Sequence, residues 1–214
     1  KDEPGFRAVL ESAMEEAEKT DKLVTIGIKP YFASTGYGYI KRKAADCPEV
    51  EEFVEKPDEE TARKYLESGR YLWNSGMFVW KVSSIMKNFE RFLPAMYEGF
   101  LKMKESAGTD SFSAVLEQCF SEFESESIDF GIMEKADNIY TLSGSFGWDD
   151  VGSWLALEKI NKTDEYGNYV AGDVITIDTG KSIICGNKKL IAAVGLEDVI
   201  VVDTDDATLI CAKS

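Results

Sequence analysis

The spacing of apolar residues changes once along the chain, at Tyr166-Gly167-Asn168, and this change constrains the fold most strongly. Upstream, runs with helical spacing alternate with short apolar runs of strand type, which is the rhythm of an α/β fold. Downstream, only short runs rich in β-branched residues remain, separated by turn formers such as Asp178-Thr179-Gly180-Lys181. We therefore expect an α/β part over residues 1–165 and a small β-rich extension with antiparallel strands over residues 166–214.

The beginning of the chain shows the helix-then-strand pattern clearly. Apolar residues recur at helical spacing over residues 6–17, with acids and lysines between them. Residues 23–28 are then almost wholly apolar, as in a strand buried on both faces. A further helix is expected to be capped by Asp58 and closed by Gly69. Helices are also expected between residues 82 and 135, so the pattern predicts a sheet flanked by helices.

Composition excludes several classes of partner and of chemistry. The net charge is −15, so we expect neither nucleic acid nor a membrane as a partner. A phosphate-bearing ligand would have to be held by a divalent cation and by individually placed lysines. Histidine is absent, which excludes His-ligated zinc, Ser-His-Asp triads and imidazole bases. Any chemistry must therefore use carboxylates, lysine and a metal ion.

The cysteines and the hydropathy pattern indicate the cellular compartment in which the protein is expected. The four cysteines are scattered, with no C-x-x-C pair, which is typical of reduced thiols in a cytoplasmic protein. No apolar run is long enough to span a bilayer, and no signal-peptide pattern opens the chain. We therefore expect a cytoplasmic protein.

Two adjacent carboxylates, Asp149 and Asp150, lie among glycines and tryptophans in residues 146–154. One interpretation is a rigid turn that presents Asp150 to a metal ion and a phosphate. The other is a helix that begins at Val151 and is capped by a side chain of this stretch, since Asp and Ser are favoured N-caps. The two roles are compatible, and the residues alone do not choose between them.

Three further positions have both a structural and a functional interpretation. Gly38 lies in a Gly-Tyr-Gly segment that is either an ordinary loop or a place where a ligand approaches the backbone. Glu55 and Lys56 precede Pro57 at the end of a strand, where α/β sheets carry ligand groups, although a surface Glu-Lys pair is also common. Asn74 begins a small polar interruption of an aromatic strand, which indicates a bulge, a ligand contact or a hairpin turn.

Five blocks of the chain, read together, resemble the mannose-1-phosphate guanylyltransferases, also called GDP-mannose pyrophosphorylases, of the sugar-nucleotidyltransferase family. These blocks are residues 36–40, 53–57, 73–78, 127–135 and 148–154. The β-rich tail resembles the branch of this family that is often fused to a mannose-6-phosphate isomerase domain. The resemblance implies the C-terminal half of a Rossmann-like mixed sheet flanked by helices, followed by the β-rich extension.

The resemblance also implies roles for individual residues. Lys56 would contact the sugar phosphate and the developing charge, and Asp150 would be a ligand of Mg²⁺. Gly38 would let the backbone approach the sugar, while Glu55 and Asn74 would bind its hydroxyls. The implied substrates are mannose 1-phosphate and GTP, which give GDP-mannose and pyrophosphate. Because the attacking phosphate is already ionised at neutral pH, no general base is required.

The chain also departs from the family pattern. Residues 31–34 lack the expected Pro- and Thr-containing segment, Lys41 stands where the family commonly has Glu, and Asp149 occupies a variable position. The family's Gly-rich nucleotide-binding signature is not in this chain, which opens on Lys1 as if cut from a longer protein. We therefore expect the intact protein to be the enzyme and this segment alone to be inactive.

Three alternatives remain open at this stage. One is a pyrophosphorylase-like regulatory subunit, and another is a transferase for a different nucleotide or sugar. The third is a metal-dependent glycosyltransferase, which an Asp-x-Asp motif after a strand would favour. Exposed strand edges in the β-rich extension would also allow a homo-oligomer to form there.

Overall fold

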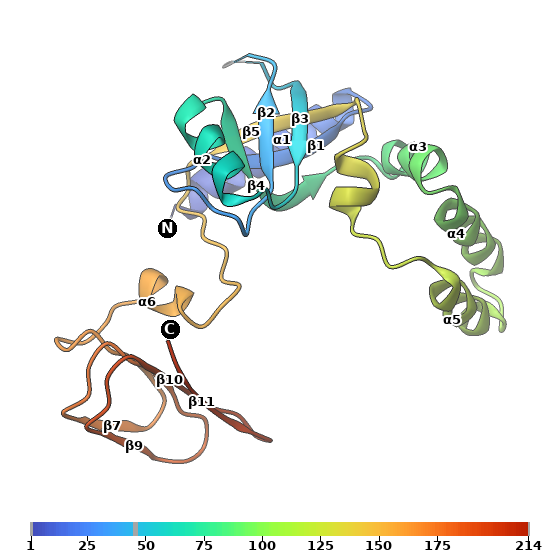
Figure 1. The fold of residues 1–214 in the computed structure, drawn as a ribbon. Coiled ribbons are helices and arrows are strands. Elements are labelled where there is room, and N and C mark those ends of the chain that lie inside the picture. Colours follow the sequence, from blue (N-terminus) through green and yellow to red (C-terminus); the bar gives the residue numbers. More distant parts are fainter. Residues whose placement is uncertain (1, 45–46, 214) are drawn as a thin grey trace. The chain divides into compact units, whose positions relative to one another are not determined.

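The computed structural model describes residues 2–44 and 47–213 and contains two compact units, Lys1–Trp148 and Asp149–Ser214 (Figure 1). The division between the units falls inside the stretch 146–154, upstream of the change in apolar spacing at residue 166. No helix in the described part of the chain is both long and apolar enough to cross a bilayer.

The first unit is an α/β fold. Its elements, in chain order, are α1 (Glu3–Lys19), β1 (Leu23–Ile28), β2 (Tyr39–Arg42), β3 (Val50–Val54), α2 (Glu59–Ser68), β4 (Tyr71–Val79), α3 (Val82–Phe92), α4 (Pro94–Ser106), α5 (Phe112–Glu122), the π-helical turn η1 (Asp129–Met133) and β5 (Ile139–Gly144). The strands form one sheet in the order β3-β2-β4-β1-β5. Only β1 and β5 pair in parallel, whereas the other neighbours are antiparallel. The prediction of a mixed sheet flanked by helices is confirmed.

Alternating side chains of β1 bury both faces of the sheet, as expected for its apolar run. Val24 packs with Ala13 and Ala17 of α1 on one face. Leu23 points to the other face and packs in a cluster with residues of α3 and η1, including Ile85. β1, an internal strand of the sheet, is therefore packed on both of its faces.

Local capping chemistry fixes the ends of α2. The Asp58 carboxylate accepts a hydrogen bond from the Thr61 N–H at 2.8 Å, and Gly69 closes the helix with a left-handed φ of 64°. Both features were predicted from the sequence and are confirmed. The helix begins just after Glu55-Lys56-Pro57, so its cap fixes the exit of the chain from β3.

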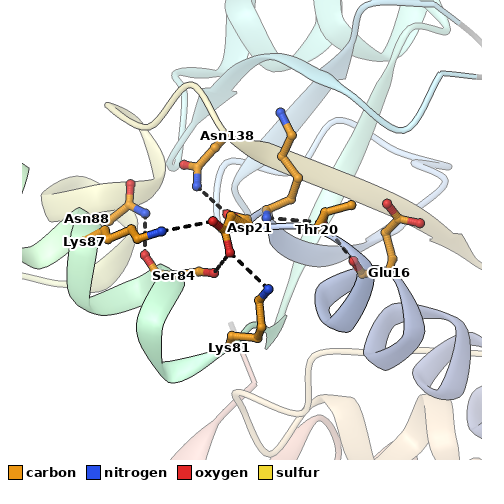
Figure 2. A network of polar contacts seen from close by, with 9 residues as sticks. Glu16, Thr20, Asp21, Lys81, Ser84, Lys87, Asn88 and Asn138 are labelled. Carbon is orange, nitrogen blue, oxygen red and sulfur yellow. Dashed lines mark hydrogen bonds and ion pairs between the residues drawn. The ribbon is translucent and has the colours of Figure 1, made fainter.

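A polar network joins the turn before β1 to α3 and β5 (Figure 2). The Asp21 carboxylate contacts the ammonium groups of Lys81 and Lys87, each at 3.0 Å, and accepts a hydrogen bond from the Ser84 hydroxyl at 3.4 Å. The Asn138 amide donates to the Asp21 carbonyl at 2.9 Å. These contacts tie together segments that are far apart in the sequence.

The polar interruption of β4 is a bulge within a continuous strand. Thr25 of β1 pairs with Phe78, whereas Gly27 pairs with Asn74, so the register shifts between these two pairs. The prediction of a bulge is confirmed, and the hairpin alternative is wrong. The bulge places Asn74 next to Trp73, which pairs with Ile28 of β1 on one side and with Tyr39 of β2 on the other.

The second unit contains a short helix and two small sheets. Its elements are α6 (Ala156–Ile160), β6 (Tyr169–Ala171), β7 (Val174–Ile177), β8 (Ile183–Cys185), β9 (Ile191–Val194), β10 (Val199–Asp203) and β11 (Thr208–Ala212). The strands form one sheet in the order β11-β10-β8-β6 and a second sheet of β7 and β9. Consecutive strands from β6 to β10 thus alternate between the two sheets, so the chain winds in successive coils from one sheet to the other.

The expectation of antiparallel strands in this unit was wrong for every pair except β10 with β11. The pairs β6–β8, β8–β10 and β7–β9 are parallel. The turn formers redirect the chain from one sheet to the other instead of closing hairpins: Asp178 and Lys181 between β7 and β8 both adopt a positive φ, of 47° and 48°. The buried Asn168 joins successive coils, since its amide donates to the Thr179 carbonyl and accepts from the Ser182 N–H.

Candidate functional site

Three of the predicted site residues meet at one point of the first unit. Gly38 directly precedes β2, Glu55 directly follows β3, and Asn74 lies in β4. The Gly38 carbonyl accepts a hydrogen bond from the Asn74 N–H at 2.7 Å. A Cβ atom on residue 38 would lie only 2.3 Å from Glu55 Oε2 and 3.2 Å from Asn74 Cβ. Glycine is therefore required here by close packing of side chains.

The Glu55 carboxylate is largely buried and only partly satisfied. Its side chain is 11% exposed, and Oε2 is buried without a hydrogen-bond partner among the described residues. Oε1 lies 3.5 Å from the Lys56 ammonium. Burial, followed by the nearby charge of Asp129, raises the pKa of the Glu55 carboxyl. A buried acceptor without a donor is costly, which makes Oε2 a candidate acceptor for a ligand hydroxyl.

Lys56 differs from Glu55 in both conformation and exposure. Its φ is +46°, a left-handed backbone that is uncommon for a residue with a side chain, and it lies between Glu55 and the buried Pro57. The Lys56 side chain is 61% exposed. The strand end thus presents an accessible cation directly beside the buried carboxylate.

The Asn74 amide is held by contacts on both of its sides. Oδ1 accepts hydrogen bonds from the Thr25 hydroxyl at 3.1 Å and from the Gly76 N–H at 3.2 Å. Nδ2 donates to Asp129 Oδ1 at 3.1 Å. The amide is therefore oriented within the protein, and the second hydrogen of Nδ2 takes no part in this network.

Asp129 and Glu134 belong to this site and were not singled out from the sequence. Both lie in the block 127–135, which carries the π-helical turn η1, and such turns are frequent at functional sites. The Glu134 carboxylate accepts from the Glu55 N–H at 2.9 Å. Burial raises the pKa of the Asp129 carboxyl, while the Asn74 hydrogen bond and the Lys56 charge oppose that rise. Their block is one of the five that resemble the sugar nucleotidyltransferases, and its acidic side chains were the signal that could have identified them.

The loop that leads to Gly38 is fixed by its own packing. The Tyr39 hydroxyl accepts from the Ser34 N–H at 2.9 Å and donates to the Ser34 carbonyl at 3.0 Å. The rings of Tyr31, Phe32 and Tyr37 each pack edge-on against Trp73, with centroids at 5.0, 4.8 and 5.1 Å. The aromatic residues at 31 and 32, where the chain departs from the family pattern, therefore anchor this loop to β4.

Asp150 belongs to the second unit, where it is exposed. Its Oδ2 lies 3.3 Å from the position of a Cβ on Gly152. The interpretation of this stretch as a capped helix from Val151 is wrong, because α6 begins only at Ala156 and its N-cap, Leu155, makes no side-chain cap hydrogen bond. The physical reason is that the glycine and the turn around residue 153 interrupt the helical spacing that follows Asp150.

The described residues contain no group of three or more His, Cys, Asp and Glu side chains placed to hold a metal ion. Mg²⁺ is commonly bound by one or two carboxylates together with substrate phosphates and water. A single exposed carboxylate such as Asp150 fits that donor set. It does not fit a metal cage built from protein ligands alone.

A pocket of about 410 Å³ elsewhere in the first unit is not this site. It lies between α4 and α5 and is lined by residues that include Lys102, Glu105 and Cys119. The site residues Glu55 and Asn74 are not among its lining residues. Size alone assigns a pocket no role, and none of the residues predicted for the site lines this one.

Comparisons with known proteins define the class to which this chain belongs. Residues 2–167 match the family model described as Nucleotidyl transferase, and residues 172–214 match the MannoseP isomerase/GMP-like beta-helix domain. The chain therefore belongs to the nucleotidyl transferase family. The beta-helix description agrees with the coiled, mostly parallel strands of the second unit.

Individual relatives narrow the comparison. The xanthan biosynthesis protein XanB of Xanthomonas campestris pv. campestris (strain B100) is 43% identical over 212 residues, which cover 98% of this chain and 45% of that protein. The mannose-1-phosphate guanylyltransferase of Escherichia coli (strain K12) is 38% identical over 221 residues, covering 100% of this chain and 46% of that enzyme. The chain thus spans about half the length of the curated relatives it matches.

A solved structure shows the same fold. The crystal structure described as mannose-1-phosphate geranyltransferase from Thermus thermophilus has a TM-score of 0.82 and 31% sequence identity. The match covers 99% of this chain and 62% of that chain. The resemblance to sugar nucleotidyltransferases that was drawn from the five sequence blocks is confirmed.

Proposed function

We propose that the protein carrying this chain transfers the guanylyl group of GTP to mannose 1-phosphate, giving GDP-mannose and pyrophosphate. Membership of the nucleotidyl transferase family and the names of several relatives support nucleotidyl transfer to a sugar phosphate. The observation that carries the proposal is the buried, unpaired Oε2 of Glu55, which lies against Gly38 and beside Asn74. Hydroxyl groups of a sugar are the donors that this oxygen lacks.

The proposed roles follow from what each group offers. Glu55 accepts hydrogen bonds from sugar hydroxyls, and the free hydrogen of Asn74 Nδ2 donates to another hydroxyl. Gly38 keeps the backbone open beside them, because any larger residue would displace the Glu55 carboxylate. Lys56 places its ammonium beside the sugar phosphate, where it offsets negative charge and orients the attacking oxygen. The phosphate is ionised at neutral pH, so a chain without histidine can support the reaction.

We assign Asp150 as the protein ligand of Mg²⁺ in this reaction. When bound, Mg²⁺ would offset the repulsion between the two phosphate-bearing substrates. The contribution of the chain is to supply one carboxylate oxygen, with the substrate phosphates completing the coordination. The exposed position of Asp150 supports this limited role, because it leaves the carboxylate accessible to an ion held by substrate phosphates.

We also propose that these 214 residues carry the sugar side of the site and do not form GDP-mannose by themselves. The Gly-rich nucleotide-binding signature of the family is not among them. Detectable turnover by the 214-residue chain alone would contradict this part of the proposal.

The direct test measures pyrophosphate release by the whole protein. Each nucleoside triphosphate is offered with mannose 1-phosphate, with and without Mg²⁺, and the assay is repeated with Asp150→Asn. We expect release with GTP that requires Mg²⁺ and falls at least about 100-fold in the variant, as for removal of an electrostatic stabiliser in an active site. Release with a different nucleotide would indicate another transferase, and no release with any nucleotide would indicate a regulatory subunit; either result would overturn the proposed specificity.

A further inference from the structure

A buried hydroxyl on β1, an internal strand of the sheet, supports the Asn74 amide. Thr25 lies in β1 with 0% of its surface exposed, and its Oγ1 donates to Asn74 Oδ1 at 3.1 Å. The strands bring the two residues together across the bulge, where Thr25 pairs with Phe78 and Gly27 pairs with Asn74. The contact joins residues that are 49 positions apart in the sequence.

The partners of Asn74 define which way its amide faces. If the amide were turned over, Nδ2 would face the Gly76 N–H, and Oδ1 would face the Asp129 carboxylate. A donor would then face a donor, and an acceptor would face an acceptor. The Thr25 hydroxyl adds a third contact from the interior of the sheet, and this contact limits rotation of the amide about its side-chain bonds.

We propose that Thr25 is a positioning residue of the sugar subsite, which aims the free Nδ2 hydrogen of Asn74 at a sugar hydroxyl without touching the sugar itself. This inference rests on the proposed function of the same site. Removing the Thr25 hydroxyl leaves the contacts of Asn74 with Gly76 and Asp129, so the amide is less restricted in rotation but is not left unsatisfied.

The neighbouring strand offers a matched control. Thr141 of β5 pairs in register with Thr25 and is also buried, yet its Oγ1 has no hydrogen-bond partner among the described residues. Thr25→Val and Thr141→Val make the same change of shape and chemistry one strand apart. Only the first removes a hydrogen bond to the site, so a general effect of replacing a buried threonine affects both variants alike.

The test combines titration of the 214-residue chain with mannose 1-phosphate and ¹⁵N NMR of the Asn74 side-chain amide. We expect Thr25→Val to weaken binding about three- to tenfold, the loss of one net hydrogen bond, and to shift or broaden the Asn74 signals. Thr25→Ser keeps the hydroxyl and should restore both readouts. Thr141→Val should leave binding and the Asn74 signals as in the unmodified chain.

Each other result overturns a defined claim. If Thr25→Val binds as tightly as the unmodified chain, or if Thr141→Val weakens binding equally, Thr25 does not position the amide, while the proposed function stands. If Thr25→Ser behaves like Thr25→Val, shape and not the hydroxyl is responsible, and the inference fails. If the unmodified chain does not bind mannose 1-phosphate, the proposed function fails, and this inference fails with it.

Discussion

Glu55 shows at the scale of one residue how a binding site reduces stability. Its carboxylate is buried, its Oε2 lacks a partner among the described residues, and its pKa is raised first by burial and then by Asp129. In the folded protein the ionised form is therefore disfavoured relative to the unfolded chain. A neutral side chain at this position would make the folded protein more stable. The presence of an acid therefore agrees with a role in binding.

The sign of this effect gives a prediction for Glu55→Gln. Above the raised pKa the unfolded chain ionises more favourably than the folded one, so the unmodified protein is penalised at neutral pH; below the usual value of 4.5 both states are protonated, and the penalty disappears. We expect Glu55→Gln to have a higher Tm than the unmodified protein at pH 7, with a difference that closes as the pH falls below 4.5. Thermal unfolding followed by circular dichroism at both pH values measures this.

Glu67→Gln is the matched control for that measurement, since Glu67 is an exposed acid on α2. It should leave the Tm unchanged at either pH. A lower Tm for Glu55→Gln at neutral pH, or a difference that does not depend on pH, would contradict the account of Glu55 as a penalised acid.

The sequence identified some of the residues at this site and missed others, for physical reasons. Gly38, Glu55 and Asn74 could be selected because each lies in a short block of unusual composition at a strand end or bulge. Thr25 could not, because a threonine within an apolar strand is common and its partner lies 49 residues away. Asp129 contacts Asn74 only through a π-helical turn, which no simple periodicity predicts.

At the scale of elements, the Asp21 network holds together parts of the first unit that local propensity does not join (Figure 2). Its ion pairs with Lys81 and Lys87 lower the pKa of Asp21 from 3.8 to about 2. A lowered carboxyl pKa contributes stability that is fully present above 3.8 and is lost as the pH falls towards 2. The network thus strengthens the connection between β1 and α3 at neutral pH.

We expect Asp21→Asn to lower the urea midpoint of unfolding at pH 7, with a gap from the unmodified protein that closes as the pH approaches 2. Equilibrium urea unfolding at several pH values and at low salt measures the gap, since screening weakens exposed ion pairs. Asp110→Asn, at an exposed site in the loop before α5, makes the same charge change and should have no effect on the midpoint. A midpoint for Asp21→Asn that equals the control at pH 7 would show that the network adds nothing.

Elements with local signals could be predicted, and those set by distant pairing could not. The cap and the Gly69 ending of α2 depend on residues within the helix and its flanks, so their prediction was confirmed. The parallel pairing of β6, β8 and β10 depends on strands that are separated by other strands, and turn residues alone do not reveal it. The prediction of a helix from Val151 was wrong, because the turn around residue 153 interrupts the helical spacing and α6 begins only at Ala156.

Across the whole molecule, the expected order of an α/β part followed by a β-rich part is confirmed, whereas the two compact units divide between Trp148 and Asp149 and not at residue 166. The exposure of the last strand of the β-rich part bears on whether the protein forms oligomers. β11 is at the edge of its four-stranded sheet, and all five of its residues are exposed, including Ile210 at 69%. An exposed apolar edge strand is a template for pairing with another chain.

We therefore predict that the protein self-associates through β11 and that Ile210→Lys shifts it towards the monomer, since a charge on an edge strand opposes pairing. Light scattering during size-exclusion chromatography over a range of concentrations measures the mass. Val82→Lys places the same charge at an exposed apolar residue of α3, 76% exposed, and should leave the mass unchanged. A monomer at all concentrations, or an equal response of both variants, would rule out association through this edge.

We propose that the first unit holds a sugar-phosphate site built from Gly38, Glu55 and Asn74. Calorimetric titration of the 214-residue chain with mannose 1-phosphate tests it most directly, with Gly38→Ala beside the control Gly36→Ala. A Cβ at residue 38 meets Glu55 Oε2 at 2.3 Å, whereas one at residue 36 meets Ser34 Oγ at 3.7 Å, an ordinary contact. The account predicts binding that survives Gly36→Ala and is lost or weakened at least about tenfold, which is roughly 1.4 kcal/mol, in Gly38→Ala. No binding by the unmodified chain, or equal binding by both variants, would contradict it.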